Sequence, residues 1–188
     1  MTLCFPFLMF QGQAQEALDH YLETFPDAQL LEVQHHPEGT EIFDPAAEST
    51  EEEDEGFPED RPDNAANRAQ RSGIASGSAG GRTSDRLVAT AQIRIGGQVL
   101  MIQDSLIRHG FSFTPSVSLA VVVDSSVEFD GIVEKLGEGG DFLMTPGDYD
   151  FAKNFAWIKD RFGVSWQVNH PLDAPDGDIA QAKAPEWS

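Results

Sequence analysis

One pattern of elements occurs twice in this chain, and it constrains the fold more than any other feature. Apolar residues recur at three- and four-residue steps over residues 14–25, which predicts an amphipathic helix that Pro26 ends. A second such stripe covers residues 129–136, after an S-x-x-E capping box that begins at Ser125. Each helix follows an apolar strand and precedes three further strand-like segments. The sequence therefore predicts two copies of a strand–helix–strand–strand–strand unit.

The predicted strands differ in how they are bounded. The run Leu3–Phe10 is apolar at almost every position, which is typical of a strand that is buried on both faces. Gly96-Gly97 marks a hairpin turn, and Gly163 marks the turn before a final strand of alternating pattern. The expected strands span residues 3–10, 28–36, 87–95, 98–104, 117–123, 142–144, 155–162 and 164–170.

A long polar stretch interrupts the first unit. Residues 37–84 contain 12 acidic residues, four Arg, four Pro and six Gly, and they show no hydrophobic period. Such a segment cannot bury enough apolar surface to offset the entropy of ordering it. We therefore divide the chain into a first βαβββ module with its crossover at 1–36 and 86–124, a disordered acidic insertion at 37–85, a second module at 115–171 and a loose tail at 172–188.

Charge and composition argue against several classes of partner. The formal net charge of −20 disfavours binding to nucleic acids and to anionic membranes. No apolar run approaches the roughly 20 residues of a membrane-spanning helix, and no basic segment with a small-residue cleavage site begins the chain. The single cysteine, Cys4, allows no internal disulfide. We expect a soluble, cytoplasmic protein.

Strand alternation predicts which side chains line a ligand site. If the apolar positions of each strand face a helix, the opposite positions face a cleft between the two sheets. In the last strand, for example, Ser165, Gln167 and Asn169 alternate with apolar residues. The predicted cleft residues are polar but uncharged, with one aromatic stacking wall: Gln103, Ser116, Ser118, Gln167, Asn169 and the wall Trp157. Such neutral groups suit a small polar ligand, and an open sheet with one solvated face is the alternative.

Four segments together resemble a known family. They are similar to the PhnB-like branch of the glyoxalase, bleomycin-resistance and extradiol-dioxygenase superfamily, also called vicinal oxygen chelate (VOC), a branch often labelled 3-demethylubiquinone 3-methyltransferase. The resemblance covers most of residues 3–36 and 86–171. It implies an α+β fold in which two βαβββ modules form a cupped mixed sheet, and assembly as a homodimer. The segments that carry it are "FLMFQGQAQEALDHYLETFPDAQL", "IGGQVLMIQDS", "FTPSVSLAVVVD" and "AWIKDRFGVSWQVNHP".

The resemblance also implies where a metal would bind. Metal enzymes of the superfamily hold a divalent ion with side chains on the first, fourth, fifth and eighth strands, typically His, Glu, His and Glu. The matching positions in this chain lie among residues 5–7 and at Gln103, Ser118 and Gln167. A set without charge is a poor site for Zn²⁺, Fe²⁺ or Ni²⁺. We therefore expect no metal and no other cofactor.

Other constellations give weaker hypotheses. His109 and His170 lie at strand margins, and we expect both at the surface. A Ser-His-Asp set can be assembled from Ser118, His109 and Asp104, but no G-x-S-x-G turn supports it. The glycine-rich runs "GSAGG" and "GEGGD" do not follow a strand, as the cofactor turn of a methyltransferase requires.

Three functional hypotheses follow. The first, which we favour, is a metal-independent protein that binds an unidentified small molecule in the cleft. The second is a VOC-type enzyme with an unusual site, acting as a lyase, an isomerase, a dioxygenase or the methyltransferase of the family label. The third is an interaction protein that acts through its acidic insertion. If the first or the second hypothesis is right, changing Gln167 should weaken the binding of the small molecule. If the third is right, deleting the insertion should abolish the binding of the partner.

Overall fold

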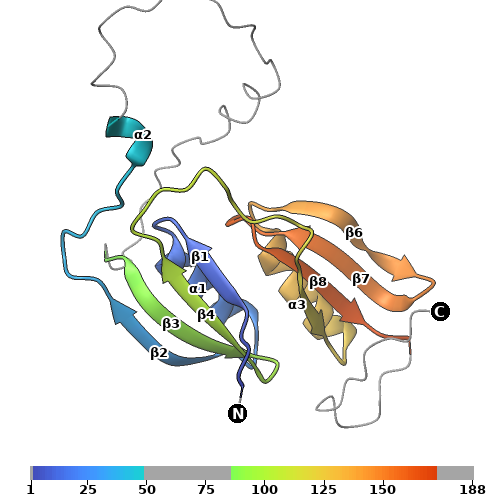
Figure 1. Cartoon of the computed structure of the whole chain (residues 1–188). Helices are drawn as coiled ribbons and strands as arrows, with labels where there is room; N and C mark the ends of the chain where they lie inside the picture. Colours follow the sequence, from blue (N-terminus) through green and yellow to red (C-terminus); the bar gives the residue numbers. More distant parts are fainter. Residues whose placement is uncertain (1, 49–85, 173–188) are drawn as a thin grey trace, which may run out of the picture.

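The computed structural model describes residues 2–48 and 86–172, and its elements follow the expected order (Figure 1). The first module contains β1 (Phe7–Phe10), α1 (Ala14–Thr24), β2 (Gln29–His35), the short helix α2 (Pro45–Glu48), β3 (Val88–Ile95) and β4 (Gln98–Asp104). The second module contains β5 (Leu119–Val122), α3 (Ser126–Gly137), β6 (Asp141–Tyr149), β7 (Ala152–Lys159) and β8 (Ser165–His170).

The strands form two four-stranded sheets of the same topology. The strand order is β1-β4-β3-β2 in the first sheet and β5-β8-β7-β6 in the second. β1 runs parallel to β4 and β5 runs parallel to β8, whereas the other neighbours are antiparallel. The predicted α+β fold of two βαβββ modules is thus confirmed. In the described ranges, no helix combines the length and the hydrophobicity needed to cross a bilayer.

The helix-facing sides of both sheets belong to one hydrophobic core. Ile102 of β4 and Val168 of β8 are both fully buried in it. Trp166 of β8 packs on α1 of the other module, with its ring centroid 5.1 Å from that of Tyr21 and 4.9 Å from that of Phe25. Helix α1 therefore contacts both sheets. The opposite side of each sheet, called its outer face below, lies outside this core.

The carboxylate of Asp104, the last residue of β4, caps helix α1. Gln13 occupies the N-cap position but makes no side-chain capping hydrogen bond. Instead, Oδ1 of Asp104 accepts hydrogen bonds from the backbone N–H groups of Gly12 (2.7 Å) and Ala14 (3.1 Å), and Oδ2 accepts one from Val88 (2.9 Å). The carboxylate thereby satisfies donors at the helix start and lies at the positive end of the helix dipole.

A second buried carboxylate, that of Asp160, links the two modules. It lies in the turn between β7 and β8 and is only 1% exposed. Its Oδ2 accepts from the hydroxyl of Tyr21 (2.8 Å) and from Nε1 of Trp166 (2.9 Å). Its Oδ1 accepts from the backbone N–H groups of Phe162 and Val164, each at 2.9 Å. Burial, and then the charge of Asp160, raise the pKa of Tyr21 well above its ordinary value, so the hydroxyl remains a donor.

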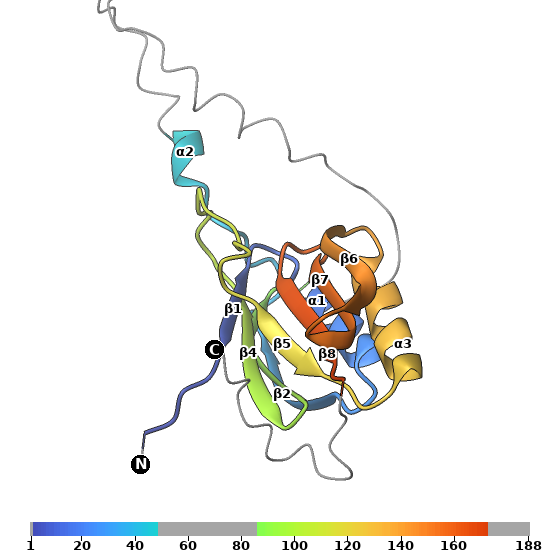
Figure 2. The same ribbon diagram turned by 90° about the vertical axis from the view of Figure 1, so that its right-hand side faces the viewer.

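The first strand is shorter and more exposed than its composition predicts. β1 begins at Phe7 and is an edge strand of its sheet. Leu8 and Phe10 are buried, but Phe7 is 48% exposed and Leu3 is 65% exposed. The residues before β1 run away from the body of the molecule (Figure 2). The prediction of a strand buried on both faces was therefore wrong, since the core covers only the helix-facing side of β1.

Two further strands have different bounds from those expected. β5 begins at Leu119, and Val117 is 74% exposed where the alternation placed it against a helix. β6 spans Asp141–Tyr149, far beyond the expected residues 142–144. Irregularities in its register with β7 let this polar, glycine-containing segment remain paired.

The first residues of the predicted insertion contact the segment that joins the modules. The backbone N–H of Phe43 donates to the carbonyl of Leu106, and the N–H of Arg108 donates to the carbonyl of Phe43, both at 2.8 Å. Nε of Arg108 also lies 3.0 Å from Oδ2 of Asp44. This segment therefore forms a parallel β-bridge on the chain between β4 and β5.

The predicted domain boundaries can be followed only in part. Residues 37–48 have the contacts just described, although composition placed them in the disordered insertion. One backbone β-bridge at Phe43 and one ion pair, which composition does not reveal, supply these contacts. Residues 49–85 and 173–188, on which the rest of the predicted insertion and almost all of the predicted tail fall, lie outside the described residues.

Candidate functional site

Four of the six predicted cleft residues lie on or beside the outer face of the second sheet. In the strand register, Gln167 of β8 stands between Ala120 of β5 and Trp157 of β7. Asn169 follows on the same face of β8, because every second residue of a strand points to the same side. Ser118 lies directly before β5 and reaches the same face through its hydroxyl group. The four residues are half-buried.

A chain of hydrogen bonds fixes part of this face. Nε1 of Trp157 donates to Oγ of Ser165 at 2.8 Å, and that oxygen lies 2.7 Å from Oγ of Ser118. The indole N–H and the Ser118 hydroxyl are thus used inside the protein, which holds the Trp157 ring in one orientation. The side-chain amide of Gln167 makes no hydrogen bond within the described ranges, and Oδ1 of Asn169 is buried there without a partner. The face therefore offers one fixed aromatic ring beside unused amide groups.

The other two predicted residues lie elsewhere. Gln103 is on the outer face of the first sheet, beside Met9 of β1 in the register. Ser116 is exposed in the segment between the modules, with its Oγ 3.2 Å from Oγ1 of Thr114. The six residues therefore do not gather in one place in the described part of a single chain. The prediction placed the polar faces around one cleft and left open whether that cleft forms within one chain or across a dimer; within this chain it is the helix-facing sides of the two sheets that share a core.

The residues at the expected metal positions do not fit a catalytic transition metal. Gln103 is on the first sheet, while Ser118 and Gln167 are on the second. The hydroxyl of Ser118 is already bonded to Ser165, and no carboxylate, imidazole or thiolate replaces the missing ligands. The described residues contain no group of three or more His, Cys, Asp or Glu side chains placed to hold an ion. Neutral amide and hydroxyl oxygens are poor ligands for Zn²⁺ or Fe²⁺.

A cavity of about 300 Å³ lies at the edge of β1, next to the segment between the modules. The ring of Phe10 packs edge-on against Phe113 at 5.2 Å and against Phe162 at 6.2 Å between centroids. None of the six predicted residues lines this cavity. We missed it because its walls come from a strand, a loop and a turn that are distant in sequence. It is lined by Phe7, Met9, Phe10, Gln11, Gln13, Phe111, Ser112, Phe113 and Phe162.

A buried histidine lies behind one wall of this cavity. The ring of His20, on α1, packs edge-on against Phe162 at 5.7 Å between centroids. The histidine is 8% exposed, and its Nε2 is buried without a hydrogen-bond partner in the described part of the chain. Burial, and then the nearby charge of Arg161, lower the pKa of His20. The imidazole is therefore held neutral beside an apolar wall.

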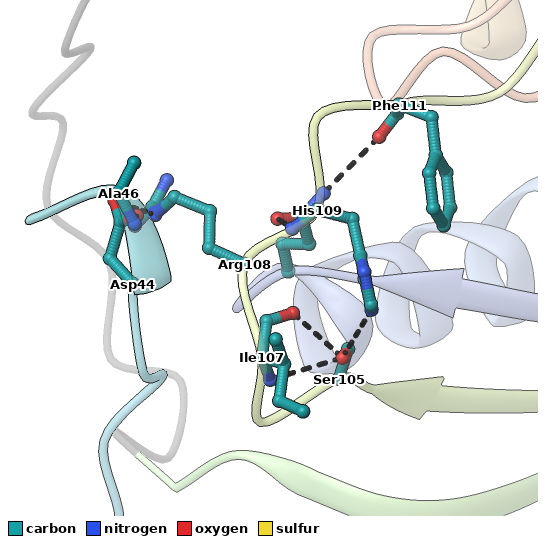
Figure 3. Close-up of polar contacts among 8 residues, drawn as sticks. Asp44, Ala46, Ser105, Ile107, Arg108, His109 and Phe111 are labelled. Carbon is teal, nitrogen blue, oxygen red and sulfur yellow. Dashed lines mark hydrogen bonds and ion pairs between the residues drawn. The ribbon is translucent and has the colours of Figure 1, made fainter. Parts of the chain in front are cut away.

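The rim of the cavity is held by side-chain hydrogen bonds (Figure 3). Oε1 of Gln11 accepts from the backbone N–H of His109 at 3.0 Å, and Nε2 of Gln11 donates to the carbonyl of Phe111 at 3.4 Å. The rings of His109 and Phe111 stack with centroids 4.7 Å apart. The segment between the modules thus has a defined shape here, although it contains no helix or strand of its own.

The Ser-His-Asp set that can be assembled from the sequence, but that no motif supported, does not form, and a different serine contacts the histidine. Oγ of Ser105, not of Ser118, lies 3.0 Å from Nε2 of His109. The same oxygen donates to the carbonyl of Ile107 at 2.8 Å and accepts from its N–H at 3.1 Å. The carboxylate of Asp104 is occupied by backbone donors, so it does not orient the imidazole. This arrangement stabilises a turn and lacks the oriented base of a hydrolase.

His170 is buried, which corrects the prediction of a surface position. It ends β8 and lies at the start of α3, as Asp104 ends β4 at the start of α1. Nδ1 of His170 is 3.0 Å from Oδ1 of Asn154 and 3.4 Å from Oγ of Ser126. The two modules thus place a buried polar side chain at the same point of the repeat. The sequence at a strand end gives no sign of this burial.

Comparisons with known proteins identify the family. The sequence matches the family described as 3-demethylubiquinone-9 3-methyltransferase over residues 3–53 and 68–169. The chain belongs to this family. A structure described as a putative 3-demethylubiquinone-9 3-methyltransferase, PhnB protein, from Bacillus cereus is 27% identical, with a TM-score of 0.63, and the match covers 90% of this chain and 99% of that one. A search of curated proteins found no match.

Two further solved structures support the fold. Protein PA1353 from Pseudomonas aeruginosa is 22% identical with a TM-score of 0.58, and the match covers 92% of this chain and 100% of that one. A glyoxylase/bleomycin resistance protein/dioxygenase domain from Frankia is 10% identical with a TM-score of 0.50, covering 92% of this chain and 93% of that one. Together with the family match and the PhnB protein from Bacillus cereus, these structures show a PhnB-like chain with the glyoxalase/VOC fold.

The glycine run within the described residues does not have the setting of a methyltransferase cofactor loop. The run Gly137–Asp141 leads from the end of α3 into β6, so it follows a helix and not a strand. Position 140 requires a glycine, because a Cβ atom would lie 2.5 Å from the carbonyl oxygen of Lys159. These glycines serve close packing of the turn on β7 and do not form a nucleotide-binding loop. The other run, residues 77–81, lies outside the described residues.

Proposed function

We propose that this PhnB-like protein binds a small, uncharged polar molecule on the outer face of its second sheet, without a metal. The observation that carries the proposal is the fixed ring of Trp157 beside unused amide groups. The Trp157–Ser165 hydrogen bond orients the ring before any ligand arrives, which lowers the entropic cost of stacking on it. Gln167, its register neighbour, then has both amide donors and its acceptor available.

The absence of charge among the predicted binding residues supports a neutral ligand, since the cation beside them in the register, Lys159, is paired with Asp141 at 2.7 Å. The chain carries a net charge of −20, yet the predicted binding residues on the second sheet are Ser118, Trp157, Gln167 and Asn169. A site for a cationic ligand would be expected to contain carboxylates, and a site for an anionic ligand would be expected to contain Arg or Lys. Neutral amides orient a neutral polar ligand through hydrogen bonds that are paired on both sides.

We further propose that the site is completed by a second copy of the chain. One outer face is open on one side, whereas ligand sites bury most of the surface of a small molecule. The outer face of the first sheet carries Gln103 and the apolar side chains of Phe7 and Met101, which would cover the opposite side of a ligand. A homodimer that places the first sheet of one copy over the second sheet of the other would gather the predicted residues that a single chain keeps apart.

Native mass spectrometry of protein purified without chelators, together with elemental analysis, tests these proposals. We expect a dimer that carries a co-purified small molecule and no stoichiometric divalent metal. Stoichiometric metal would contradict the metal-free site, and a monomer that retains the small molecule would contradict completion by a second copy.

A substitution then tests the site itself. Gln167→Leu removes the unused amide, so the affinity for the molecule released from the dimer should fall roughly 5- to 150-fold, which corresponds to about 1–3 kcal/mol. Gln98→Leu is the matched control, because Gln98 is exposed in the β3–β4 hairpin of the other sheet. Equal affinities of the two variants would place the site elsewhere.

A further inference from the structure

We propose that the aromatic cavity at the edge of β1 is a second binding site, for an uncharged molecule of one or two fused aromatic rings that carries a hydroxyl group. The cavity shares no lining residue with the outer face of the second sheet. Phe7 belongs both to this cavity and to the face of the first sheet that would close the other site, so the test below includes a variant that distinguishes the two sites.

The walls of the cavity determine the apolar part of this ligand. Five of its nine lining residues are phenylalanines, and Met9 adds a flexible thioether. Phe10 already packs edge-on against Phe113 and against Phe162, which is a geometry that aromatic rings prefer. A volume of about 300 Å³ is at the lower end of ligand sites, so it accommodates a small ring system.

The charges around the cavity exclude an ion as the preferred ligand. No charged side chain is among the lining residues. The adjacent cation, Arg161, is already engaged, because its guanidinium group lies 4.9 Å from the ring centre of Phe162 and 3.3 Å from Oε1 of Glu16. An anion would therefore enter without a free counter-charge, into a chain whose net charge is −20.

Two polar lining groups are placed to bond the hydroxyl group of a ligand. Ser112 and Gln13 are exposed at the cavity, and their side chains make no hydrogen bond within residues 2–48 and 86–172. The third polar residue, Gln11, is already bonded to the backbone at His109 and Phe111. One hydroxyl group on an otherwise apolar ligand can form hydrogen bonds with these two available side chains.

The rim of the cavity is held in place before a ligand binds. Gln11 holds the chain at His109 and Phe111, and these two rings stack on each other (Figure 3). On the other side of the same segment, Arg108 is bonded to Phe43 and Asp44. Phe111 remains 62% exposed although it is fixed, which leaves an aromatic surface open to a ligand at the cavity. Such preorganisation reduces the entropic cost of binding.

Titration of the full chain with 2-naphthol, measured by isothermal titration calorimetry, tests the site. We expect saturable binding to the wild type and weaker binding of the anion 2-naphthoate. Ser112→Trp fills the cavity from an exposed position, so it should weaken 2-naphthol binding about tenfold or more. Thr114→Trp is the matched control, since Thr114 is an exposed residue of the same segment that does not line the cavity, and the variant should bind 2-naphthol like the wild type.

Three results would overturn the proposal. One is the lack of saturable 2-naphthol binding to the wild type, and another is an equal loss of affinity in the two tryptophan variants. The third is loss of 2-naphthol binding in Gln167→Leu, because that result would assign the ligand to the outer face of the second sheet. Unchanged binding in Gln167→Leu supports two separate sites.

Discussion

His20 is one of two described residues that bury a polar side-chain atom without a hydrogen-bond partner. Its ring is enclosed by Tyr21 and Phe162, and its buried Nε2 has no partner in the described part of the chain. The charged groups that act on it are Arg161 and Asp160 from the β7–β8 turn, Glu138 after α3, and Glu23 on its own helix. Burial is the largest cause that lowers the pKa of His20, and the charge of Arg161 acts in the same direction. The folded chain therefore holds this imidazole neutral.

This arrangement predicts a dependence of stability on pH. Folding lowers the pKa of His20 below its value of about 6.5 in the unfolded chain. At pH values between these two pKa values, His20 binds a proton in the unfolded chain but not in the folded one. The contribution of His20 to stability is thus present above pH 6.5 and is lost as the pH falls below it. His20→Phe keeps an aromatic ring and removes the titration, so its stability relative to the wild type should increase as the pH is lowered from 7.5 to 5.5. Urea unfolding at several pH values measures this difference, and a difference that does not change with pH would contradict the assignment.

Sequence reasoning succeeded for residues whose role depends on neighbours in the chain and failed for those whose role depends on distant ones. The capping serine Ser125 was predicted from a local motif, and its hydroxyl accepts from the N–H of Glu128 at 3.2 Å. The alternation of the last strand predicted that its apolar positions face a helix, and Trp166, one of them, packs on α1. The burial of His170 and the contact of Ser118 with Ser165 depend on packing between strands, which alternation does not determine.

At the scale of elements, the two helices begin in different ways. Helix α3 has its own capping serine, whereas α1 takes its cap from Asp104 at the end of β4. The start of α1 is therefore formed only when β4 is in place. The same carboxylate also holds the first residue of β3, Val88, so one side chain joins three elements of the first module.

Removal of this cap should destabilise the whole first module. Asp104→Ala leaves three backbone N–H groups without an acceptor, at Gly12, Ala14 and Val88. Two of these donors, at Ala14 and Val88, are buried, and each unsatisfied buried donor costs about 1–3 kcal/mol, so the free energy of unfolding should fall by about 2 kcal/mol or more. Asp19→Ala is the control on the same helix, where only a Gln15 amide is bonded at 2.9 Å, and it should cost about 0.5 kcal/mol or less. Chemical denaturation measures both, and equal losses would show that the cap has no special role.

The order of elements was predictable, but their edges were not. Helical periodicity and glycine turns depend on local backbone preferences, so α1, α3 and the β3–β4 hairpin agree with prediction. The extent of β6 depends on its pairing with β7, and the exposure of β1 depends on its position at a sheet edge. Neither of these is encoded in the strand's own composition.

At the scale of the whole molecule, the contact between the modules determines where a site can form. Because α1 packs on Trp166 of the second module, the helix-facing sides of both sheets are used for stability, and within the described residues the outer faces and the cavity at β1 remain for ligands. Sequence alternation distinguished the faces of each strand but not the relative placement of the sheets. That placement rests on side chains such as Asp160 that join the modules.

The Tyr21–Asp160 hydrogen bond predicts that the two modules unfold together. Tyr21→Phe removes one of four donors from a buried carboxylate while it retains the packed ring, so the free energy of unfolding should fall by about 1.5–3 kcal/mol. Tyr149→Phe is the matched control, because the hydroxyl of Tyr149 bonds only the carbonyl of Thr145 at an exposed position, and it should change stability by about 0.5 kcal/mol or less. Since the bond lies between modules that share one core, Tyr21→Phe should lower the midpoint of a single unfolding transition. Tryptophan fluorescence, which reports mainly on the second module, and circular dichroism, which reports on both modules, should give the same midpoint. Two separated transitions in the wild type would show instead that the modules are independent and that the shared core does not couple them.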